Sequence, residues 1–460
     1  MLVKCGLHAR RIAAKYALIS ATYASAPIWM NLSRRFDCRV RGRKGGEGMR
    51  VLKTLAQTTI LGCAVSMIPA AAFAGGWSTE GIADYDLLFA DGKFVVESGA
   101  TYADRNVDFK NAETSQIGLA GPVPTDTTNS SANDIAPDIA VFSGAVKIGL
   151  LENLDLFARI NQPYLIREQP GFDWNGRFAI GETNADSLGV DAMLSYKHEL
   201  SKGNYVRVFG GLRSVTVDYE QLANTDASAL NFGELDTAIN VDSERAYGYR
   251  IGAAFEKPEI ALRAMVAYES ATDLDLDGTL NIEGLGTYDA VAKAQLPQSV
   301  EAKLQTGIAP KWLATLGVKW TDWSVLSAVD VAVDAPIAPL PLAAVPNSVV
   351  RNLGYSDGWI VEAGVGHQLT DKLSLGSSVT WDKGIGGPYS DTYSLSLGGS
   401  YDLAENVKFT LGGRAIYKTA GEGTYEISKI AAAGDSSVTT NYEYDASWNF
   451  ALSSKIRVAF

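Results

Sequence analysis

The chain has 460 residues, and its 52 acidic side chains outnumber its 40 basic ones, which gives a formal net charge of −12. This acidity argues against nucleic acid as a partner, because the phosphate backbone is bound by basic surfaces. Beyond residue 74 no apolar run reaches about 18 residues, so the sequence predicts no transmembrane helix there.

The N-terminal region has the features of a targeting segment. A basic start follows Met49, an apolar run covers residues 60–68, and Ala72 and Ala74 supply a small-residue cleavage site. We therefore expect residues 1–48 to be an upstream mis-start and 49–74 to be a signal peptide. All three cysteines precede residue 75, so the exported chain would have no thiol for a disulfide or a metal.

Residues 75–92 show no alternation of apolar and polar side chains and are too few to fold alone. After them, alternating segments recur between turn signals up to the last residue. We predict strands in 93–460, fourteen in all. Their expected ranges are 93–109, 138–150, 153–166, 185–200, 203–219, 244–257, 259–271, 296–309, 311–326, 357–370, 372–384, 390–403, 405–419 and 444–460.

The last of these strands shows the alternation most clearly. Phe460, Val458 and Ile456 lie on one face, whereas Arg457 and Lys455 lie on the other. An apolar face that ends in an aromatic residue, on a strand long enough to cross a bilayer at a tilt, is typical of outer-membrane barrels. A strand of a soluble β-sandwich is the alternative for this segment taken alone.

The connections between strands alternate in length. Short turns are expected near residues 151–152, 201–202, 257–258, 310, 371 and 404, and most of the gaps between them are long. Short periplasmic turns and long outer loops characterise outer-membrane barrels. We therefore expect 109–137, 220–243, 272–295, 327–356 and 420–443 to face outside. Aromatic residues near strand ends would form interfacial girdles, namely Trp312, Trp359, Trp381, Tyr401 and Tyr444.

The predicted fold is therefore all-β: a 14-stranded antiparallel transmembrane β-barrel. A barrel of this size has a lumen wide enough to leak. We expect residues 75–92 to form an N-terminal hatch that plugs it.

Two stretches of the chain resemble FadL-type outer-membrane transporters for long-chain fatty acids and other hydrophobic compounds. The resemblance covers roughly residues 77–460 and implies passive transport through a plugged barrel. Its residues are Leu296-Pro297-Gln298-Ser299-Val300-Glu301, Gly307, Pro310-Lys311-Trp312, Val318-Lys319-Trp320-Thr321-Asp322-Trp323-Ser324 and, at the first short turn, Gly149-Leu150-Leu151-Glu152-Asn153-Leu154.

The resemblance has one departure, in the hatch. Family members commonly carry an Asn-Pro-Ala tripeptide there, and this chain has none in that region. The corresponding residues are Asp84, Tyr85, Asp86, Leu87, Leu88 and Phe89.

Two predicted outer loops carry many apolar side chains. Exposed apolar groups of this kind pack against each other or against a hydrophobic ligand, and both possibilities are open here. The family resemblance implies that these two loops form the outer groove that first captures the substrate. The candidate ligand-binding residues are Leu222, Leu230, Phe232, Leu235, Leu274, Leu276, Leu280, Ile282 and Leu285.

A second candidate site lies in the lumen. Parity turns Phe157, Arg159 and Asn161 inward on the third strand, and Lys319 inward on the ninth. Because a buried fatty-acid headgroup needs a cation, Arg159 and Lys319 are the candidates to hold it. The alternative is that both cations form ion pairs with Glu301 or Asp155.

The third strand also contains Pro163, which cannot donate a hydrogen bond to its neighbour. In the family a kink in this strand opens a side window to the membrane, so the resemblance implies lateral exit near Asn161 and Pro163.

Other functions are weaker candidates. A general porin for polar solutes remains an alternative, and an outer-membrane enzyme is a lesser one. The Asp273–Gly278 stretch lacks the spacing of a calcium loop, and we expect no metal and no cofactor. The expected partners are hydrophobic small molecules, outer-membrane lipid and lipopolysaccharide, and the barrel-assembly machinery through the strand that ends at Phe460. We expect a monomer in the outer membrane.

Overall fold

The computed structural model describes residues 76–82, 85–118, 129–228, 231–336 and 339–460. These residues form a closed antiparallel β-barrel of 14 strands, as the sequence predicts. The expected mis-start and signal peptide lie outside the described residues, as do Asp84 and Leu230.

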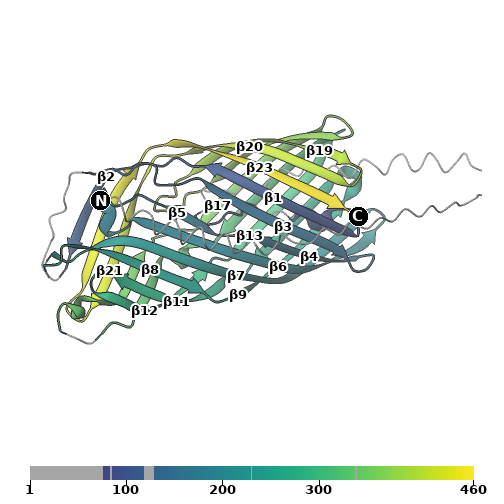
Figure 1. Cartoon of the computed structure of the whole chain (residues 1–460). Helices are drawn as coiled ribbons and strands as arrows, with labels where there is room; N and C mark the ends of the chain where they lie inside the picture. The colour runs from purple at the N-terminus through teal and green to yellow at the C-terminus, as the bar shows by residue number, and fades with distance from the viewer. Residues whose placement is uncertain (1–75, 83–84, 119–128, 229–230, 337–338) are drawn as a thin grey trace, which may run out of the picture. The chain divides into compact units, whose positions relative to one another are not determined.

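Consecutive barrel strands pair with one another, and β1 closes the ring by pairing with β23, with Val95 opposite Ala459. Short turns, such as the one between β6 and β7, lie at the same end of the barrel as the C-terminus (Figure 1). The barrel strands are β1 (Phe94–Asp104), β3 (Ile139–Gly149), β4 (Leu154–Asn161), β6 (Glu182–Ser201), β7 (Asn204–Asp226), β9 (Ala246–Lys257), β10 (Leu262–Glu269), β13 (Ser299–Ala309), β14 (Trp312–Thr321), β17 (Gly358–Gln368), β18 (Leu373–Asp382), β19 (Thr392–Ala404), β20 (Val407–Lys418) and β23 (Ser447–Ala459).

The opposite end carries a second set of paired strands, which we call the outer tier. The sequence pattern assigns these ranges to loops, but the structure pairs them one after another, starting from the long strand β7. In β11, Leu274 and Leu276 are buried and the alternating Asp273, Asp275 and Asp277 are exposed, which is why this stretch forms a strand. The outer tier consists of β8 (Glu234–Ser243), β11 (Thr272–Ile282), β12 (Gly286–Leu296), β15 (Ala328–Val333), β16 (Pro346–Asn352), β21 (Gly421–Ala431), β22 (Ser436–Tyr444) and β2 (Phe109–Ile117).

The remaining elements are short. They are β5 (Leu165–Glu168) and the 3-10 helices η2 (Asp86–Phe89), η3 (Asn175–Phe178), η5 (Pro258–Ile260), η6 (Trp323–Leu326) and η7 (Leu342–Ala344). Within the described ranges, no helix is long and apolar enough to cross a membrane.

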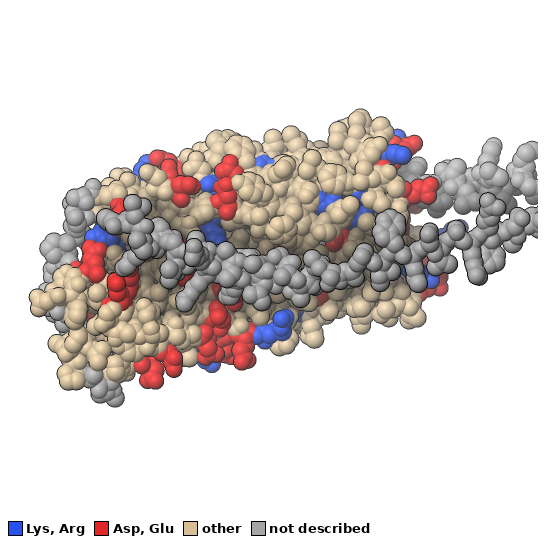
Figure 2. Space-filling model, in the orientation of Figure 1, with Lys and Arg blue, Asp and Glu red and all other residues tan. Residues whose placement is uncertain are grey.

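The barrel wall has its apolar side chains outside. In β13, Val300 and Leu304 are exposed while Glu301 and Gln305 are buried, and in β14 Leu316 is exposed while Lys319 is buried. This is the predicted parity of a strand with lipid on one face and the lumen on the other. On the face shown in Figure 2, uncharged residues cover most of the barrel between its ends, and most acidic side chains lie toward the outer tier.

One predicted girdle residue is wrongly assigned. Tyr444 ends β22 and is only 3% exposed, because β23 begins at Ser447, after a break in the strand. Its ring packs near that of Tyr442, and the Lys418 ammonium lies 3.6 Å from its ring centre. Tyr444 is therefore part of the outer-tier core rather than of the lipid interface.

The described residues of the N-terminal segment, 76–82 and 85–92, lie against inward-facing side chains of the barrel wall. Tyr85, Leu87 and Leu88 form one buried cluster with inward side chains of the wall, including Phe157 and Phe209. The ring centres of Tyr85 and Phe209 are 5.3 Å apart. The barrel interior at this level is therefore filled by the chain itself.

Candidate functional site

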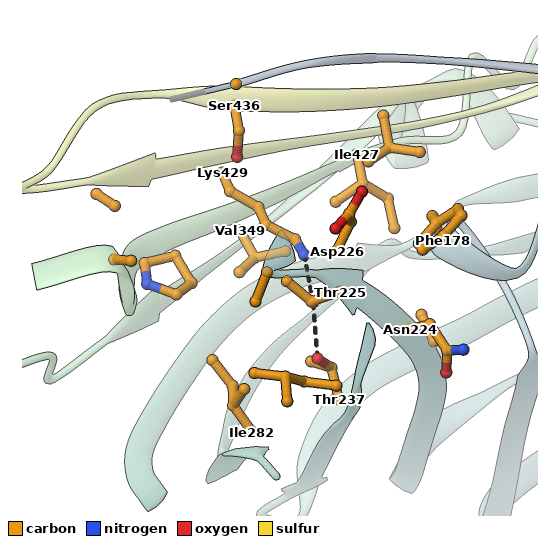
Figure 3. Close-up of a pocket in the computed structure, with 18 of the residues that line it drawn as sticks. Phe178, Asn224, Thr225, Asp226, Thr237, Ile282, Val349, Ile427, Lys429 and Ser436 are labelled. Carbon is orange, nitrogen blue, oxygen red and sulfur yellow. Dashed lines mark hydrogen bonds between the residues drawn. The ribbon is translucent and has the colours of Figure 1, made fainter. Parts of the chain in front are cut away.

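An apolar cavity of about 150 Å³ lies within the outer tier (Figure 3). Its wall combines side chains from separate outer-tier strands, such as Ile282 of β11, Val349 of β16 and Ile427 of β21, with Phe178 of η3. An apolar cavity of this volume accommodates one aromatic ring. The outer tier therefore encloses a space that suits a small hydrophobic ligand.

The predicted outer-loop residues separate into three groups. Leu235, Leu280, Ile282 and Leu285 line this cavity. Two others, Leu274 and Leu276, are buried in the adjoining hydrophobic core. The remaining described ones do not line the cavity: Leu222 is half-buried on β7, and Phe232 is 45% exposed in the β7–β8 turn.

The cavity also contains a cation that the sequence analysis missed. Lys429 of β21 donates to Thr225 Oγ1 at 2.8 Å, and Thr225 Oγ1 lies 2.7 Å from Thr237 Oγ1. Lys429 lies in the outer tier, beyond the membrane-spanning strands, and burial lowers the pKa of its ammonium to about 8. The only sequence signal for Lys429 is its alternating position on the inward face of β21. Because the sequence predicts a loop for these residues, inward and outward positions cannot be assigned there from the sequence.

A second cavity, of about 120 Å³, lies between the N-terminal segment and the barrel wall. Ile82 and Leu87 of the segment line it, together with Phe157, Arg159 and Asn161 of β4. The structure thus brings the predicted lumen residues of the third strand together in one pocket. Lys319 does not line this pocket.

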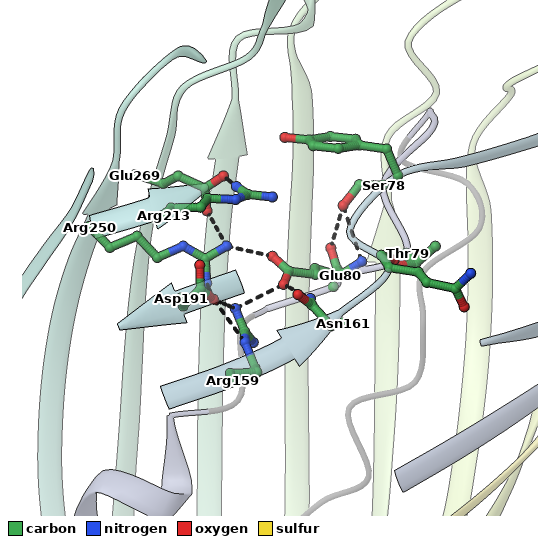
Figure 4. Close-up of polar contacts among 12 residues, drawn as sticks. Ser78, Thr79, Glu80, Arg159, Asn161, Asp191, Arg213, Arg250 and Glu269 are labelled. Atoms are coloured by element: carbon green, nitrogen blue, oxygen red, sulfur yellow. Dashed lines mark hydrogen bonds and ion pairs between the residues drawn. The ribbon is translucent and has the colours of Figure 1, made fainter. Parts of the chain in front are cut away.

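A network of ion pairs connects the N-terminal segment to the wall (Figure 4). Glu80 lies 2.9 Å from Arg159 and 2.8 Å from Arg250, and Asp191 pairs with the same two arginines at 2.6 and 3.0 Å. Arg250 also lies 2.6 Å from Glu269. Since these groups are mostly buried, each charge depends on its partners to offset desolvation.

The two predicted headgroup cations are therefore engaged by the N-terminal segment. Arg159 pairs with Glu80, and Lys319 donates to the carbonyl of Gly81 at 3.1 Å. Of the expected alternative, in which both cations form ion pairs with Glu301 or Asp155, the Arg159–Asp155 pair is wrong, because Asp155 instead lies near Lys147 and Arg207. Sequence analysis missed Glu80, although it is the only charged residue in 76–82.

The wall strand next to this network is interrupted at Pro163. β4 ends at Asn161 and β5 begins at Leu165. The N-terminal segment fills the gap: Thr79 N donates to Pro163 O at 2.9 Å, and Leu165 N donates to Trp77 O at 2.8 Å. The proline break and the N-terminal segment therefore meet at one place in the wall.

The backbone at the break has a second partner. The Ser187 hydroxyl donates to Tyr164 O at 2.7 Å and accepts from Tyr164 N at 2.8 Å. These bonds replace those that a continuous strand would make with β6.

The predicted hatch residues lie in the lumen where the structure describes them. Asp86 pairs with Arg263 at 3.0 Å, and the guanidinium of Arg263 lies 3.8 Å from the ring centre of Phe89. Leu87 and Leu88 are buried. Charge pairing and apolar packing both attach this segment to the wall.

Comparison with known proteins identifies relatives of this fold. Residues 87–412 match the family model described as "Outer membrane protein transport protein (OMPP1/FadL/TodX)". A Pseudomonas aeruginosa FadL homologue of known structure is 15% identical, with 85% of this chain and 94% of that chain covered and a TM-score of 0.64.

Two toluene transporters also share the fold. The Ralstonia pickettii protein TbuX is 12% identical, with 85% of this chain and 97% of that chain covered and a TM-score of 0.55. The Pseudomonas putida protein TodX is 11% identical, with 85% and 96% covered and a TM-score of 0.55. No curated protein sequence matches the chain.

Proposed function

The chain belongs to the OMPP1/FadL/TodX family of outer membrane transport proteins, as the residues around Pro310 predict, and on this premise we propose that it transports small hydrophobic molecules by passive diffusion. The proposed route has three stages: capture in the outer cavity, displacement of the N-terminal segment acting as a hatch, and lateral exit at the break in the third barrel strand.

The outer cavity supports the capture stage. Its apolar lining removes water from a hydrophobic ligand, and each buried methylene contributes about 0.8 kcal/mol. The volume of about 150 Å³ suits a single aromatic ring or a short alkyl segment rather than a whole long fatty acid. An aromatic compound of the size of toluene therefore fits better than a long-chain acid at this stage.

The strand break supports the exit stage, and it is the single observation that carries the proposed route. The carbonyl of Pro163 and the N–H of Leu165 are bonded to the N-terminal segment, while Tyr164 between them is bonded to Ser187 of β6. When that segment moves, Pro163 O and Leu165 N lose their partners, and the interruption between β4 and β5 becomes the proposed place of exit. Movement of the hatch and opening of the exit are thus one event in this proposal.

The hatch favours this route over the porin alternative. A general porin needs a water-filled lumen, whereas here Tyr85, Leu87 and Leu88 pack against the lumen wall. Polar solutes would meet a buried apolar cluster on this path.

The test compares hydrophobic and polar solutes. Cells with the protein in their outer membrane should accumulate labelled toluene faster than cells without it. Liposomes that contain the purified protein should not swell in glucose or other small sugars. Swelling that depends on sugar size, without a gain in toluene accumulation, would support the porin alternative and contradict the proposal.

A further inference from the structure

In the described ranges, the cations of the lumen and the cation of the outer cavity differ in what they contact. In the lumen, Arg159 has Glu80 and Asp191 as acidic partners, and Lys319 donates to a backbone carbonyl of the N-terminal segment. These side chains already have protein partners. A ligand would have to displace the segment to reach them.

Lys429 in the outer cavity differs. An ammonium group has three N–H donors, and within the described ranges the structure gives this one a single hydrogen bond, to the hydroxyl of Thr225. No carboxylate of a described residue lies within 4.0 Å of its nitrogen. Figure 3 shows the nitrogen directed toward Thr225 and Thr237, which lie on β7 and β8.

One other charged residue lines the cavity, Asp226 of β7. One oxygen of its carboxylate accepts the N–H of Ser228 at 2.8 Å, so it is held by its own turn. The remaining polar groups that line the cavity are neutral. The cavity therefore combines an apolar wall with one cation whose charge no ion pair in the described structure offsets.

Lys429 is half-buried; a partly desolvated charge without a counterion is costly, and an anionic ligand would reduce that cost. A carboxylate matches one ammonium in charge and accepts its free N–H groups, whereas a phosphate dianion would need further cations. The apolar wall requires a compact hydrophobic body attached to that group.

We propose that the outer cavity binds carboxylic acids with a compact apolar body, of the alkylbenzoate class, and that Lys429 holds the carboxylate. This inference rests on the proposed function, since it assigns an acidic ligand to the same capture cavity.

Calorimetry on the purified full-length protein in lipid nanodiscs tests this assignment. The probes are 4-methylbenzoate and 4-methylbenzamide, which match the size of toluene most closely, share shape and differ in charge. At pH 7 the wild-type protein should bind the acid roughly tenfold more tightly than the amide, as expected for a charge-assisted hydrogen bond. Lys429→Met should lose this preference and keep amide binding, and Lys429→Arg should retain it.

The pH dependence gives a second readout. The free ammonium has a pKa of about 8, so acid binding should be constant near pH 6–7 and weaken as pH rises above 8, where the ammonium loses its proton. Lys429→Met should show no such loss. Asp226 is the other titratable group that lines the cavity, and Asp226→Asn should strengthen acid binding without removing the pH dependence.

Lys293→Met is the matched control, because this lysine is 88% exposed and does not line the cavity. It should behave like the wild type. Equal binding of acid and amide by the wild type, or a preference that survives in Lys429→Met, would overturn the inference and leave hydrophobic capture intact. If no variant binds either probe, both this inference and the proposed capture of hydrophobic ligands in the outer cavity are overturned.

Discussion

The charged side chains of the outer cavity and those around the N-terminal segment differ in their partners. In the lumen, Glu80 and Asp191 each lie within 3.0 Å of both Arg159 and Arg250, so these four charges offset each other. In the outer cavity, Lys429 has only a neutral hydroxyl as its partner in the described structure. Under the proposed function, the inner charges hold the N-terminal segment in place, and Lys429 is the charge that an anionic ligand would pair with.

The same contrast applies to apolar side chains. Those of the hatch pack against the wall and fill the lumen, whereas those of the outer tier surround an open volume. In the proposed route, capture and closure therefore belong to separate regions, and we expect that each can be changed without the other.

The largest effect is expected from loosening the hatch. Glu80→Gln removes the charge that pairs with two buried arginines, and breaking a buried pair costs about 3–5 kcal/mol. The equilibrium should shift toward a displaced hatch by roughly two orders of magnitude or more. Ion conductance of the purified protein in planar bilayers should rise.

The control is Glu259→Gln, since Glu259 is 80% exposed and lies 4.0 Å from Lys257. It should leave conductance unchanged. A Glu80→Gln protein with wild-type conductance would mean that the ion pairs do not hold the hatch.

A smaller effect is expected from obstructing the exit. A Cβ on Gly189 of β6 would lie 2.9 Å from Asn161 Oδ1 and 3.0 Å from the Pro163 ring. Gly189→Val should therefore crowd the strand break, and overpacking of this kind should slow uptake about fivefold or more. Ligand binding in the outer cavity should be unaffected, as measured by calorimetry.

Gly413→Val on β20 is the matched control, because its added Cβ would have nothing closer than 3.7 Å. Equal uptake by both valine variants would argue against exit at Pro163.

A still smaller effect is expected in the outer cavity. Ile282→Asp places a charge in its apolar lining, and losing one buried isoleucine should raise the half-saturating ligand concentration roughly tenfold. Asn281→Asp, next to it on the exposed face of β11, should have no effect. If Ile282→Asp takes up ligand like the wild type, the outer leucines and isoleucines serve only to pack the tier.

No change in uptake is expected from Asn281→Cys, which reports orientation instead. An impermeant maleimide should label it on whole cells, because the outer tier faces outside in this account. Glu259→Cys, in the turn between β9 and β10, should not be labelled. Labelling of Glu259→Cys but not of Asn281→Cys would mean that the barrel has the opposite orientation in the membrane.

The sequence predicts the barrel well because period-2 alternation is a local signal. Val300 and Glu301 differ in exposure for a reason visible in neighbouring residues. The outer tier is less predictable, since Leu274 and Leu276 alternate correctly but their strand partners lie elsewhere in the chain. The sequence wrongly places Tyr444 at the lipid interface, because the apolar–polar alternation of β23 extends back past Ser447, where the strand begins.

The candidate site depends even more on distant contacts. The alternation of side chains predicts that Arg159 faces inward. Its partner Glu80 lies in a segment without such alternation, so the sequence does not predict the pair. Lys429 lies on β21, and only pairing with β16 brings it to the cavity. Residue type and parity therefore predicted which side chains face inward, and the fold decided which of them meet.

The central claim is that the hatch must leave the strand break before a molecule can exit. Ser78 and Tyr164 are bridge partners across that break, and Thr79 N and Leu165 N bond on either side of them. Such a non-hydrogen-bonded pair has its Cα atoms about 4.5 Å apart, which a disulfide can span. The measurement is toluene uptake by the Ser78→Cys, Tyr164→Cys protein, oxidised and then reduced. The account predicts no uptake by the oxidised form, unchanged binding in the outer cavity, and restored uptake after reduction. Full uptake by the oxidised form, with the disulfide verified by mass spectrometry, would contradict it.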